Sequence, residues 1–359
     1  MDKSELDKKV KLIEKRKEEG ILLCLEKAVQ SRKATTLFDD VRLLNNALPE
    51  INMEDIDIST TFLGHKFAAP IFIGAMTGGA ELAKKVNGNL AKAAQELGIG
   101  MAVGSQRAGL LTKGLAETYS ITRKVAPDIF IGSNIGGAQL SQGLSIGDAK
   151  KLIEMLDADA LYVHLNPLQE VIQPEGEAEY RNVLKRITEL VSGLDTPVAV
   201  KEVGAGISDE VAKRLERAGV SAIEIAGLGG TSWSGVESYR AKAANDAIKF
   251  KTGNFFWDWG IPTAAALYGV RKAVKLPVVA SGGIRNGLDM AKAIAMGADL
   301  CAMAWPLLRP ATISSENVND TIAMQKSYAA KGEKISPRMA AYVIAVDRVA
   351  RAMKARGWY

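Results

Sequence analysis

The sequence predicts an α/β fold of the (β/α)₈ barrel type, with a helical and strand-containing extension before the barrel and closing helices after it. From Pro70 onward, eight short apolar segments alternate with helical patterns. The apolar segments are hydrophobic on both faces, as parallel strands covered by helices are. Polar or glycine-rich residues follow each of them, which is typical of barrels with chemistry at the carboxyl ends of the strands. A doubly wound open sheet is the alternative, but no GxGxxG motif opens the first β/α turn.

The expected elements follow in order along the chain. Residues 2–31 form a charged segment with helical periodicity, and residues 35–68 contain strand-like pieces at 56–58 and 61–63 around a Gly64-His65 turn. The expected barrel strands are 70–74, 99–103, 129–132, 160–164, 198–201, 222–225, 277–280 and 300–304. The expected helices are 81–97, 115–125, 148–156, 179–192, 209–218, 236–249 with 262–274, and 287–296.

This order predicts two parts of the chain. Residues 1–68 are expected to form an N-terminal extension that packs on the barrel and contributes substrate-binding residues. Residues 69–359 are expected to form the catalytic barrel. The tail after Thr312, with a periodic run at 339–349, is interpreted as closing helices or a subunit contact.

Composition and charge exclude several classes of protein. The chain has 359 residues, of which 47% are hydrophobic and 24% charged, which excludes a largely disordered chain. The 46 basic residues exceed the 41 acidic residues by five, and they alternate with them instead of forming a basic block with aromatic residues. We therefore expect no nucleic-acid partner. No apolar run reaches the roughly 18 residues of a membrane span, and the first thirty residues are charged, so a cytoplasmic protein without a membrane partner is expected.

The two cysteines do not indicate a metal or disulfide framework. Cys24 and Cys301 form no CxxC or CxxH pattern, so each is interpreted as a small buried apolar residue.

The seventh expected strand is followed by a glycine-rich loop. The segment 281–287, Ser-Gly-Gly-Ile-Arg-Asn-Gly, leads directly into an expected helix. Glycines let the backbone approach a phosphate, and free N–H groups at a helix start can donate to it. A capped tight turn would have the same residues. Its position favours a phosphate-bearing cofactor, because the loops after strands seven and eight commonly bind phosphate in such barrels.

Two groups of basic residues have two interpretations each. Lys201 ends an apolar strand and faces either an anion, such as the N1–C2 oxygen region of a reduced flavin, or a salt-bridge partner, Glu202 or Glu224. The run Lys15-Arg16-Lys17 is either a solvated helix face or, with Arg107, a set of phosphate contacts.

The richest cluster of polar side chains follows the fourth expected strand. His164 and Asn166 fall on one face of an alternating segment, and Gln169 and Glu170 come directly after it. The first three offer hydrogen bonds to a polar ligand head, although a single histidine is more often structural. Glu170 is a hard oxygen ligand that suits Mg²⁺, which proteins commonly bind through few carboxylates and the phosphates of a substrate.

Together these segments resemble the type 2 isopentenyl-diphosphate isomerases, the flavin-dependent isomerases of isoprenoid biosynthesis. The resemblance covers about residues 10–310, and its most specific stretch is 164–176, HLNPLQEVIQPEG. The other matching stretches are Arg16-Lys17, 75–79, 103–107, 229–233, 259–263 and 280–285.

The resemblance implies a TIM barrel that interconverts isopentenyl and dimethylallyl diphosphate without net redox change. It implies FMN in its reduced form, Mg²⁺, and NADPH or another reductant. The implied FMN-binding residues are Ala75, Met76, Thr77, Ser105, Asn134, Lys201, Thr231, Gly283, Arg285, Ala304 and Trp305. The implied substrate-binding residues are Arg16, Lys17, Ser105, Gln106, Arg107, His164, Asn166 and Gln169. Glu170 is the implied metal ligand, and Gln169, Glu170 and His164 are the candidate catalytic residues. The family also implies a homotetramer or homo-octamer.

Two positions depart from the family pattern. The family usually has a histidine at the position of Gly20, so the way in which the N-terminal arm closes over substrate is open, and a diverged relative with reduced activity is an alternative. Trp305 stands where a smaller aliphatic residue is common, which alters packing beside the flavin phosphate.

The expected chemistry requires a proton to be added at one carbon and removed from another. None of the side chains named above is an obvious strong acid facing an apolar alkene. Since N5 of a reduced flavin can deliver and retrieve a proton, the hypothesis assigns acid–base catalysis to the flavin. The protein then anchors the diphosphate, orients the substrate and excludes water.

Three other functions make different demands on the sequence. An FMN-dependent oxidoreductase such as a 2-hydroxy-acid oxidase needs a histidine base after a late strand, where neither His65 nor His164 lies. An IMP dehydrogenase-like enzyme needs a cysteine in a loop, whereas Cys301 falls within an expected strand. A flavin- or phosphate-binding module without catalysis does not need the cluster from His164 to Glu170.

Overall fold

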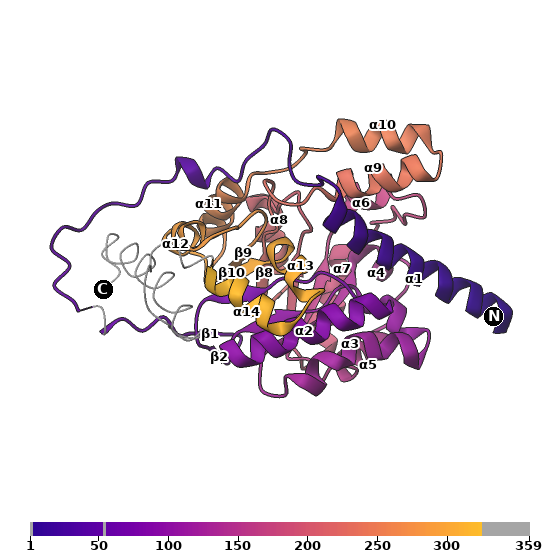
Figure 1. Cartoon of the computed structure of the whole chain (residues 1–359), viewed down its shortest axis with the longest axis horizontal. Helices are drawn as coiled ribbons and strands as arrows, with labels where there is room; N and C mark the ends of the chain where they lie inside the picture. Colours follow the sequence, from indigo (N-terminus) through magenta and orange to yellow (C-terminus); the bar gives the residue numbers. More distant parts are fainter. Residues whose placement is uncertain (1–2, 53–54, 325–359) are drawn as a thin grey trace.

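A closed barrel of eight parallel strands forms the centre of the protein. The computed structural model describes residues 3–52 and 55–324, and Figure 1 shows how its helices surround the strands. The strands follow one another around the barrel in the order β10-β3-β4-β5-β6-β7-β8-β9. They are β3 (Ile71–Ile73), β4 (Gly100–Ala102), β5 (Ile131–Gly136), β6 (Ala160–His164), β7 (Val198–Lys201), β8 (Ala222–Glu224), β9 (Val278–Ala280) and β10 (Leu300–Met303). The predicted (β/α)₈ barrel is confirmed.

Helices lie between successive strands and cover the outside of the barrel. A long helix, α1 (Lys3–Glu26), precedes them. The others are α2 (Glu81–Leu97), α3 (Lys113–Val125), α4 (Gly137–Ser141), α5 (Ile146–Glu154), α6 (Pro167–Ile172), α7 (Val183–Gly193), α8 (Asp209–Arg217), α9 (Trp233–Ala243), α10 (Ala247–Phe255), α11 (Thr263–Ala273), α12 (Gly287–Ala295), α13 (Trp305–Ala311) and α14 (Ser315–Met324). Short 3₁₀ helices occur at Phe38–Asp40 and Gln106–Leu110.

The predicted strands differ from the observed ones mainly at two places. β5 extends to Gly136, because it pairs with β6 in continuous register from Gly132 with Ala160 to Gly136 with His164. Ser133 and Asn134 therefore lie within a strand, and the prediction that they form a loop is wrong. The prediction of a strand-like piece at 56–58 is also wrong, since pairing begins at Thr60. The periodic run at 339–349 lies outside the described residues.

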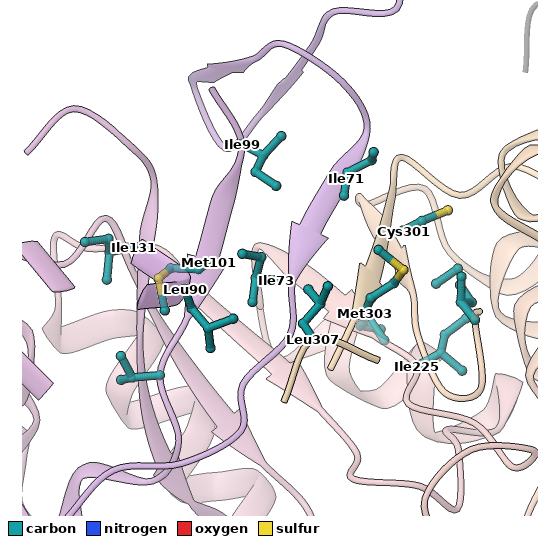
Figure 2. Packing of buried hydrophobic residues seen from close by; sticks show 14 of the residues in the cluster. Ile71, Ile73, Leu90, Ile99, Met101, Ile131, Ile225, Cys301, Met303 and Leu307 are labelled. Carbon is teal, nitrogen blue, oxygen red and sulfur yellow. The ribbon is translucent and has the colours of Figure 1, made fainter. Parts of the chain in front are cut away.

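Alternation along the strands divides the core into two layers. Phe72 points into the barrel and belongs to an inner cluster with Tyr162 and several alanines. Its neighbours Ile71 and Ile73 belong to a larger outer cluster that packs against the helices. Figure 2 shows part of this outer layer, where Ile73 and Met101 lie near Leu90 of α2.

A short hairpin closes the barrel at the amino ends of its strands. Strands β1 (Thr60–Phe62) and β2 (His65–Phe67) pair antiparallel, and Phe62 and Phe67 join the inner cluster. Phe130, just before β5, packs against both rings, with centroids 5.7 and 5.9 Å away. This end of the barrel is filled with apolar side chains, so ligand access is confined to the opposite end.

The N-terminal extension is fastened to the barrel by backbone groups. The carboxylate of Asp258 accepts hydrogen bonds from the N–H groups of Arg32 and Lys33, at 2.8 and 2.7 Å. Farther along, Lys292 Nζ donates to the carbonyl of Phe38 at 2.6 Å. In the described part of the chain, no helix combines the length and apolar character needed to cross a membrane.

Candidate functional site

An open cavity with a volume of about 270 Å³ lies where the carboxyl ends of the barrel strands meet. Every one of the eight strands contributes to its wall through its last residues or the loop that follows. α1 crosses this mouth of the barrel and adds five more residues, Arg16, Lys17, Gly20, Ile21 and Cys24. The cavity therefore brings together residues from the whole length of the barrel and from α1, from Arg16 to Leu308.

All of the predicted site residues except Gln106 line this cavity. Gln106 is fully buried, and its amide is used within the protein. Its Nε2 donates to the carbonyl of Leu152 at 3.0 Å, and its Oε1 accepts from Ser133 Oγ at 2.5 Å and from the N–H of Asn134 at 2.8 Å. The structure thus places Gln106 behind the wall, where it orients Asn134, and not in contact with a ligand.

His164 lies at the cavity wall as a neutral imidazole. Its Nδ1 is 2.7 Å from Asn134 Oδ1, so that nitrogen carries the proton and donates it to the amide oxygen. Burial, together with the charges of Lys201 and Lys17, lowers the pKa of His164 to about 3. At neutral pH the ring is therefore a hydrogen-bonding group of fixed tautomer and does not exchange protons.

Asn166, Gln169 and Glu170 form a connected row after β6. Asn166 Nδ2 donates to Gln169 Oε1 at 3.1 Å and to Glu170 Oε1 at 3.0 Å. Gln169 Nε2 donates in turn to Glu237 Oε1 at 3.1 Å. These bonds assign each amide its orientation, since Nε2 of Gln169 must face a carboxylate. The sequence analysis missed Glu237, whose only signal was a carboxylate three residues before an arginine on one face of α9.

A buried arginine ties this row to α1. Arg240 contacts three carboxylates, those of Glu19 at 3.3 Å, Glu175 at 2.6 Å and Glu237 at 2.8 Å. Its side chain is only 9% exposed, so these contacts are poorly screened. Burial raises the pKa of Glu237 above its ordinary value, although Arg240 opposes that effect. Sequence spacing could not reveal this group, because its members come from three separate segments: α1, the loop after α6, and α9.

The basic residues at the cavity are already partly engaged with carboxylates. Arg107 forms a two-pronged ion pair with Glu177, at 2.5 and 2.7 Å. Lys17 lies on α1 near Arg16, Arg107 and Glu170, and burial with the two guanidinium groups lowers the pKa of Lys17 to about 7. The nearby carboxylates thus offset only part of the positive charge at the cavity, so an anionic ligand would bind favourably there.

Lys201 has the salt-bridge partner Glu224, one of the two interpretations of the sequence. Its Nζ donates to the carbonyl of Glu202 and lies 3.8 Å from Glu224 Oε1. Ser281 Oγ donates to the same carboxylate oxygen at 2.9 Å, while Glu224 Oε2 is buried without a hydrogen-bond partner among the described residues. Lys201 is therefore ion-paired and still exposes part of its side chain to the cavity.

The loop after β9 has a backbone that only glycine can adopt at its centre. Gly282 and Gly283 have φ angles of 98° and 73°, in the left-handed region. A Cβ on Gly282 would lie 2.1 Å from the carbonyl oxygen of Gly227, and one on Gly230 would lie 2.5 Å from the N–H of Gly283. Two glycine-rich loops consequently pack backbone against backbone beside Arg285.

Another glycine sets the position of Glu170. A Cβ on Gly176 would lie 1.8 Å from the carbonyl oxygen of Glu170, and the next residue, Glu177, donates its N–H to Glu170 Oε2 at 2.8 Å. We predict that Gly176→Ala lowers kcat/KM about 10- to 100-fold, because the segment must shift and release this carboxylate. Steady-state kinetics measure the loss. Gly114→Ala is the matched control, since its Cβ would meet nothing within 4 Å; equal losses in both variants would contradict the prediction.

Comparisons with known proteins agree with this geometry. Residues 21–116 and 164–327 match the family of FMN-dependent dehydrogenases. The chain is 48% identical to the isopentenyl-diphosphate delta-isomerase of Methanosarcina mazei over 304 residues, which are 85% of this chain and 82% of that protein. It is 50% identical to the isopentenyl-diphosphate delta-isomerase of Thermococcus kodakarensis over 303 residues, covering 82% of this chain and 80% of that protein.

Solved structures support the same architecture at much lower identity. A flavocytochrome b2 variant with bound sulfite superposes with a TM-score of 0.61 at 16% identity, covering 94% of this chain and 79% of that chain. A mandelate oxidase variant with an FMN monooxide adduct gives a TM-score of 0.55 at 16% identity, over 91% and 89% of the two chains. Likeness at this identity establishes the fold alone.

Proposed function

Because this chain belongs to the type 2 isopentenyl-diphosphate delta-isomerase family, we propose that it interconverts isopentenyl and dimethylallyl diphosphate with reduced FMN. The observation that carries the proposal is the convergence, in one cavity, of three cationic side chains with the carboxylate of Glu170 and the glycine-rich loop after β9. Lys17, Arg16 and Arg107 supply the cations. A module that only binds flavin would not need this second, cation-rich half of the cavity.

The residues present fit a flavin nucleotide. Gly282, Gly283 and Arg285 line the cavity, and the left-handed backbone of the two glycines lets this loop pack directly against the backbone of Gly227 and Gly229. Glycine-rich loops can present backbone N–H groups to a phosphate. In the loop after β3, Thr77 Oγ1 is buried without a hydrogen-bond partner among the described residues. A polar ring edge would satisfy this hydroxyl, since unpaired buried hydroxyls are costly.

We assign FMN to the wall that carries these features. The residues that would hold it are Ala75, Met76, Thr77, Ser105, Asn134, Lys201, Thr231, Gly283, Arg285, Ala304 and Trp305, all of which line the cavity. When bound, reduced FMN supplies a proton donor and acceptor together with an electron-rich ring. The apolar wall formed by Ile21 and Cys24 of α1 keeps water away from an alkene placed there.

The diphosphate is assigned to the part of the cavity lined by α1 and the loops after β4 and β6. Arg16, Lys17 and Arg107 provide charge, while His164, Asn166 and Gln169 provide oriented hydrogen bonds, and Ser105 lies beside them. Since Glu170 is the one acidic side chain of the row after β6, we propose that it binds Mg²⁺ together with oxygens of the diphosphate and water. The described residues contain no group of three His, Cys, Asp or Glu side chains placed to hold a metal by themselves.

The polar row gives the chain's own residues distinct roles. His164 stays neutral because its pKa is lowered to about 3, and with Nδ1 donating to Asn134 its Nε2 is a hydrogen-bond acceptor. Gln169 is held at a fixed orientation by Glu237, so its amide positions the substrate, and Arg240 holds the other oxygen of the Glu237 carboxylate at 2.8 Å. We propose Gln169, Glu170 and His164 as the catalytic candidates, with Glu237 lying behind Gln169.

Three further features belong to the same proposal. We propose NADPH or another two-electron donor as the source of reduced FMN, a cytoplasmic location, and a homotetramer or homo-octamer as the assembly.

A direct assay tests the proposed function. Protein is incubated anaerobically with FMN, Mg²⁺, dithionite and isopentenyl diphosphate in D₂O, and products are followed by NMR. We expect dimethylallyl diphosphate that carries deuterium, with no net consumption of reductant beyond that needed to reduce the flavin. Absence of product, together with flavin reduction by a 2-hydroxy acid, would instead establish an oxidoreductase.

A further inference from the structure

The carboxyl end of α1 is capped by side chains of α13. Trp305 Nε1 donates to the carbonyl of Cys24 at 2.9 Å, and the guanidinium of Arg309 donates to the carbonyl of Leu25. Both carbonyls belong to the last turn of α1, where a helix has no internal partners for them. The end of α1 is therefore fixed by a helix that follows β10, more than 270 residues later in the chain.

The same indole also contacts the phosphate end of the cavity. The guanidinium carbon of Arg285 lies 4.7 Å from the centroid of the Trp305 ring, within cation–π range. Arg285 donates to Gln30 Oε1, and Gln30 Nε2 donates to Thr231 Oγ1 at 3.2 Å. We call the group Cys24, Gln30, Arg285 and Trp305 the α1 clasp.

The clasp connects to the cationic half of the cavity through α1 itself. Lys17 precedes Cys24 by seven residues, which is two turns or about 10 Å of helix. Both line the cavity, and a helix is stiff over that length. Displacement of the Cys24 carbonyl would therefore displace Lys17. A second attachment, the pair of Glu19 with Arg240 at 3.3 Å, holds the same part of α1 on its other side.

We propose that Trp305 is a positioning residue that couples the cofactor-phosphate end of the cavity to the diphosphate-binding end through the α1 clasp. Trp305 contacts Arg285 with its ring face and α1 with its N–H, so it is the residue that belongs to both ends. A phosphate group at the glycine-rich loop after β9 fixes Arg285, and with it the ring that contacts the end of α1. Placement of α1 then favours a diphosphate at Arg16 and Lys17, and by linkage the diphosphate favours the phosphate group.

This inference rests on the proposed function for its assignment of the two ends, but its test does not require turnover. The dissociation constant of oxidised FMN is measured by quenching of its fluorescence, with and without saturating inorganic pyrophosphate and Mg²⁺. We expect pyrophosphate to tighten FMN binding to the wild-type protein about 10-fold, within the usual range of such coupling. In Trp305→Leu, which lacks both ring and N–H, the ratio is expected to fall to within twofold of one. Trp305→Phe, which keeps a ring face, is expected to give an intermediate ratio.

The controls separate coupling from damage to the fold. Trp259→Leu removes a tryptophan that is 61% exposed and lies outside the cavity lining, so its ratio should equal that of the wild type. Gln30→Met breaks the clasp without touching Trp305 and should also lower the ratio, which keeps the test available if Trp305→Leu does not fold. An unchanged ratio in both clasp variants, or a ratio of one in the wild type, would overturn the proposal. If the ratio of FMN dissociation constants changes as expected but isopentenyl diphosphate is not isomerised, the proposed function is wrong and the coupling through the α1 clasp is still supported.

Discussion

Glu170→Gln is expected to lower kcat/KM for isopentenyl diphosphate by about 10²- to 10³-fold, while FMN binding is kept. Loss of one preorganised electrostatic group at a reacting site commonly has this effect. The structure adds a specific reason. One Glu170 oxygen accepts from Asn166 Nδ2 and the other from the N–H of Glu177, at 3.0 and 2.8 Å. An amide must direct its NH₂ group at one of these two donors, so the side chain would turn away from the position that Mg²⁺ requires.

The Mg²⁺ dependence of the rate separates this effect from simple misfolding. For the wild type, the rate is expected to saturate with Mg²⁺, whereas Glu170→Gln should show little saturation over the same range. Glu179→Gln is the matched control, because Glu179 is exposed on the segment that carries Glu177. The metal assignment would be wrong if Glu170→Gln kept the wild-type Mg²⁺ dependence, whatever its rate.

Local pattern was sufficient to predict the strands whose ends carry the site. The predicted bounds of 160–164 and 198–201 match β6 and β7, and those of 81–97 match α2. These segments have apolar residues at the period that their structure requires, and no competing signal. Since a barrel brings all carboxyl strand ends to one rim, placing the strands was enough to place Lys201 and His164 together.

What could not be predicted depends on contacts between distant segments. β5 continues to Gly136 because β6 pairs with it, which is not visible in the polar residues Ser133 and Asn134. Gln106 has a polar amide in the loop after a strand, as ligand-binding residues often do, yet tertiary packing directs this amide to the carbonyl of Leu152. These polar groups can be buried because each forms a hydrogen bond with a group from another β/α unit. Such pairs of distant residues cannot be identified from a single sequence.

Gly20 is an unusual residue for the interior of a long helix such as α1, which crosses the cavity. Gly20 lies within a helix, where glycine costs about 1 kcal/mol relative to alanine. A Cβ there would meet nothing within 4 Å, so neither packing against the barrel nor a turn requires glycine. Gly20 lines the cavity between Lys17 and Cys24, at the position where the family usually has a histidine. The charges that α1 brings to the cavity are those of Arg16 and Lys17, which therefore carry more of the diphosphate interaction.

Lys17→Arg is accordingly expected to remove the pH dependence that Lys17 gives to diphosphate binding. In the free protein the pKa of Lys17 is lowered to about 7 by burial and by Arg16 and Arg107, so the lysine is charged below pH 7 and largely neutral at pH 8.5. A diphosphate beside it favours the charged form, which means that binding at pH 8.5 takes up a proton. The affinity for pyrophosphate should fall up to tenfold per pH unit above pH 7 in the wild type. In Lys17→Arg the guanidinium stays charged throughout, and this fall should disappear.

Titration calorimetry at pH 8.5 in buffers of different ionisation enthalpy measures the protons taken up. We expect the wild type to take up nearly one proton more than Lys17→Met. The Lys17→Met variant is the reference because it retains the ionisations of pyrophosphate and of every other group. Lys17→Met should bind pyrophosphate about 10- to 100-fold more weakly than the wild type at pH 6.5, where the lost charge matters, and nearly equally at pH 9, where the lysine is mostly neutral.

The pH dependence of stability has the opposite sign to that of binding. Between pH 7 and about 10.5 the unfolded chain holds a proton on Lys17 that the folded, ligand-free protein does not, so the free energy of unfolding should rise with pH in that window. Equal proton uptake by the wild type and Lys17→Met would show that Lys17 does not face the diphosphate.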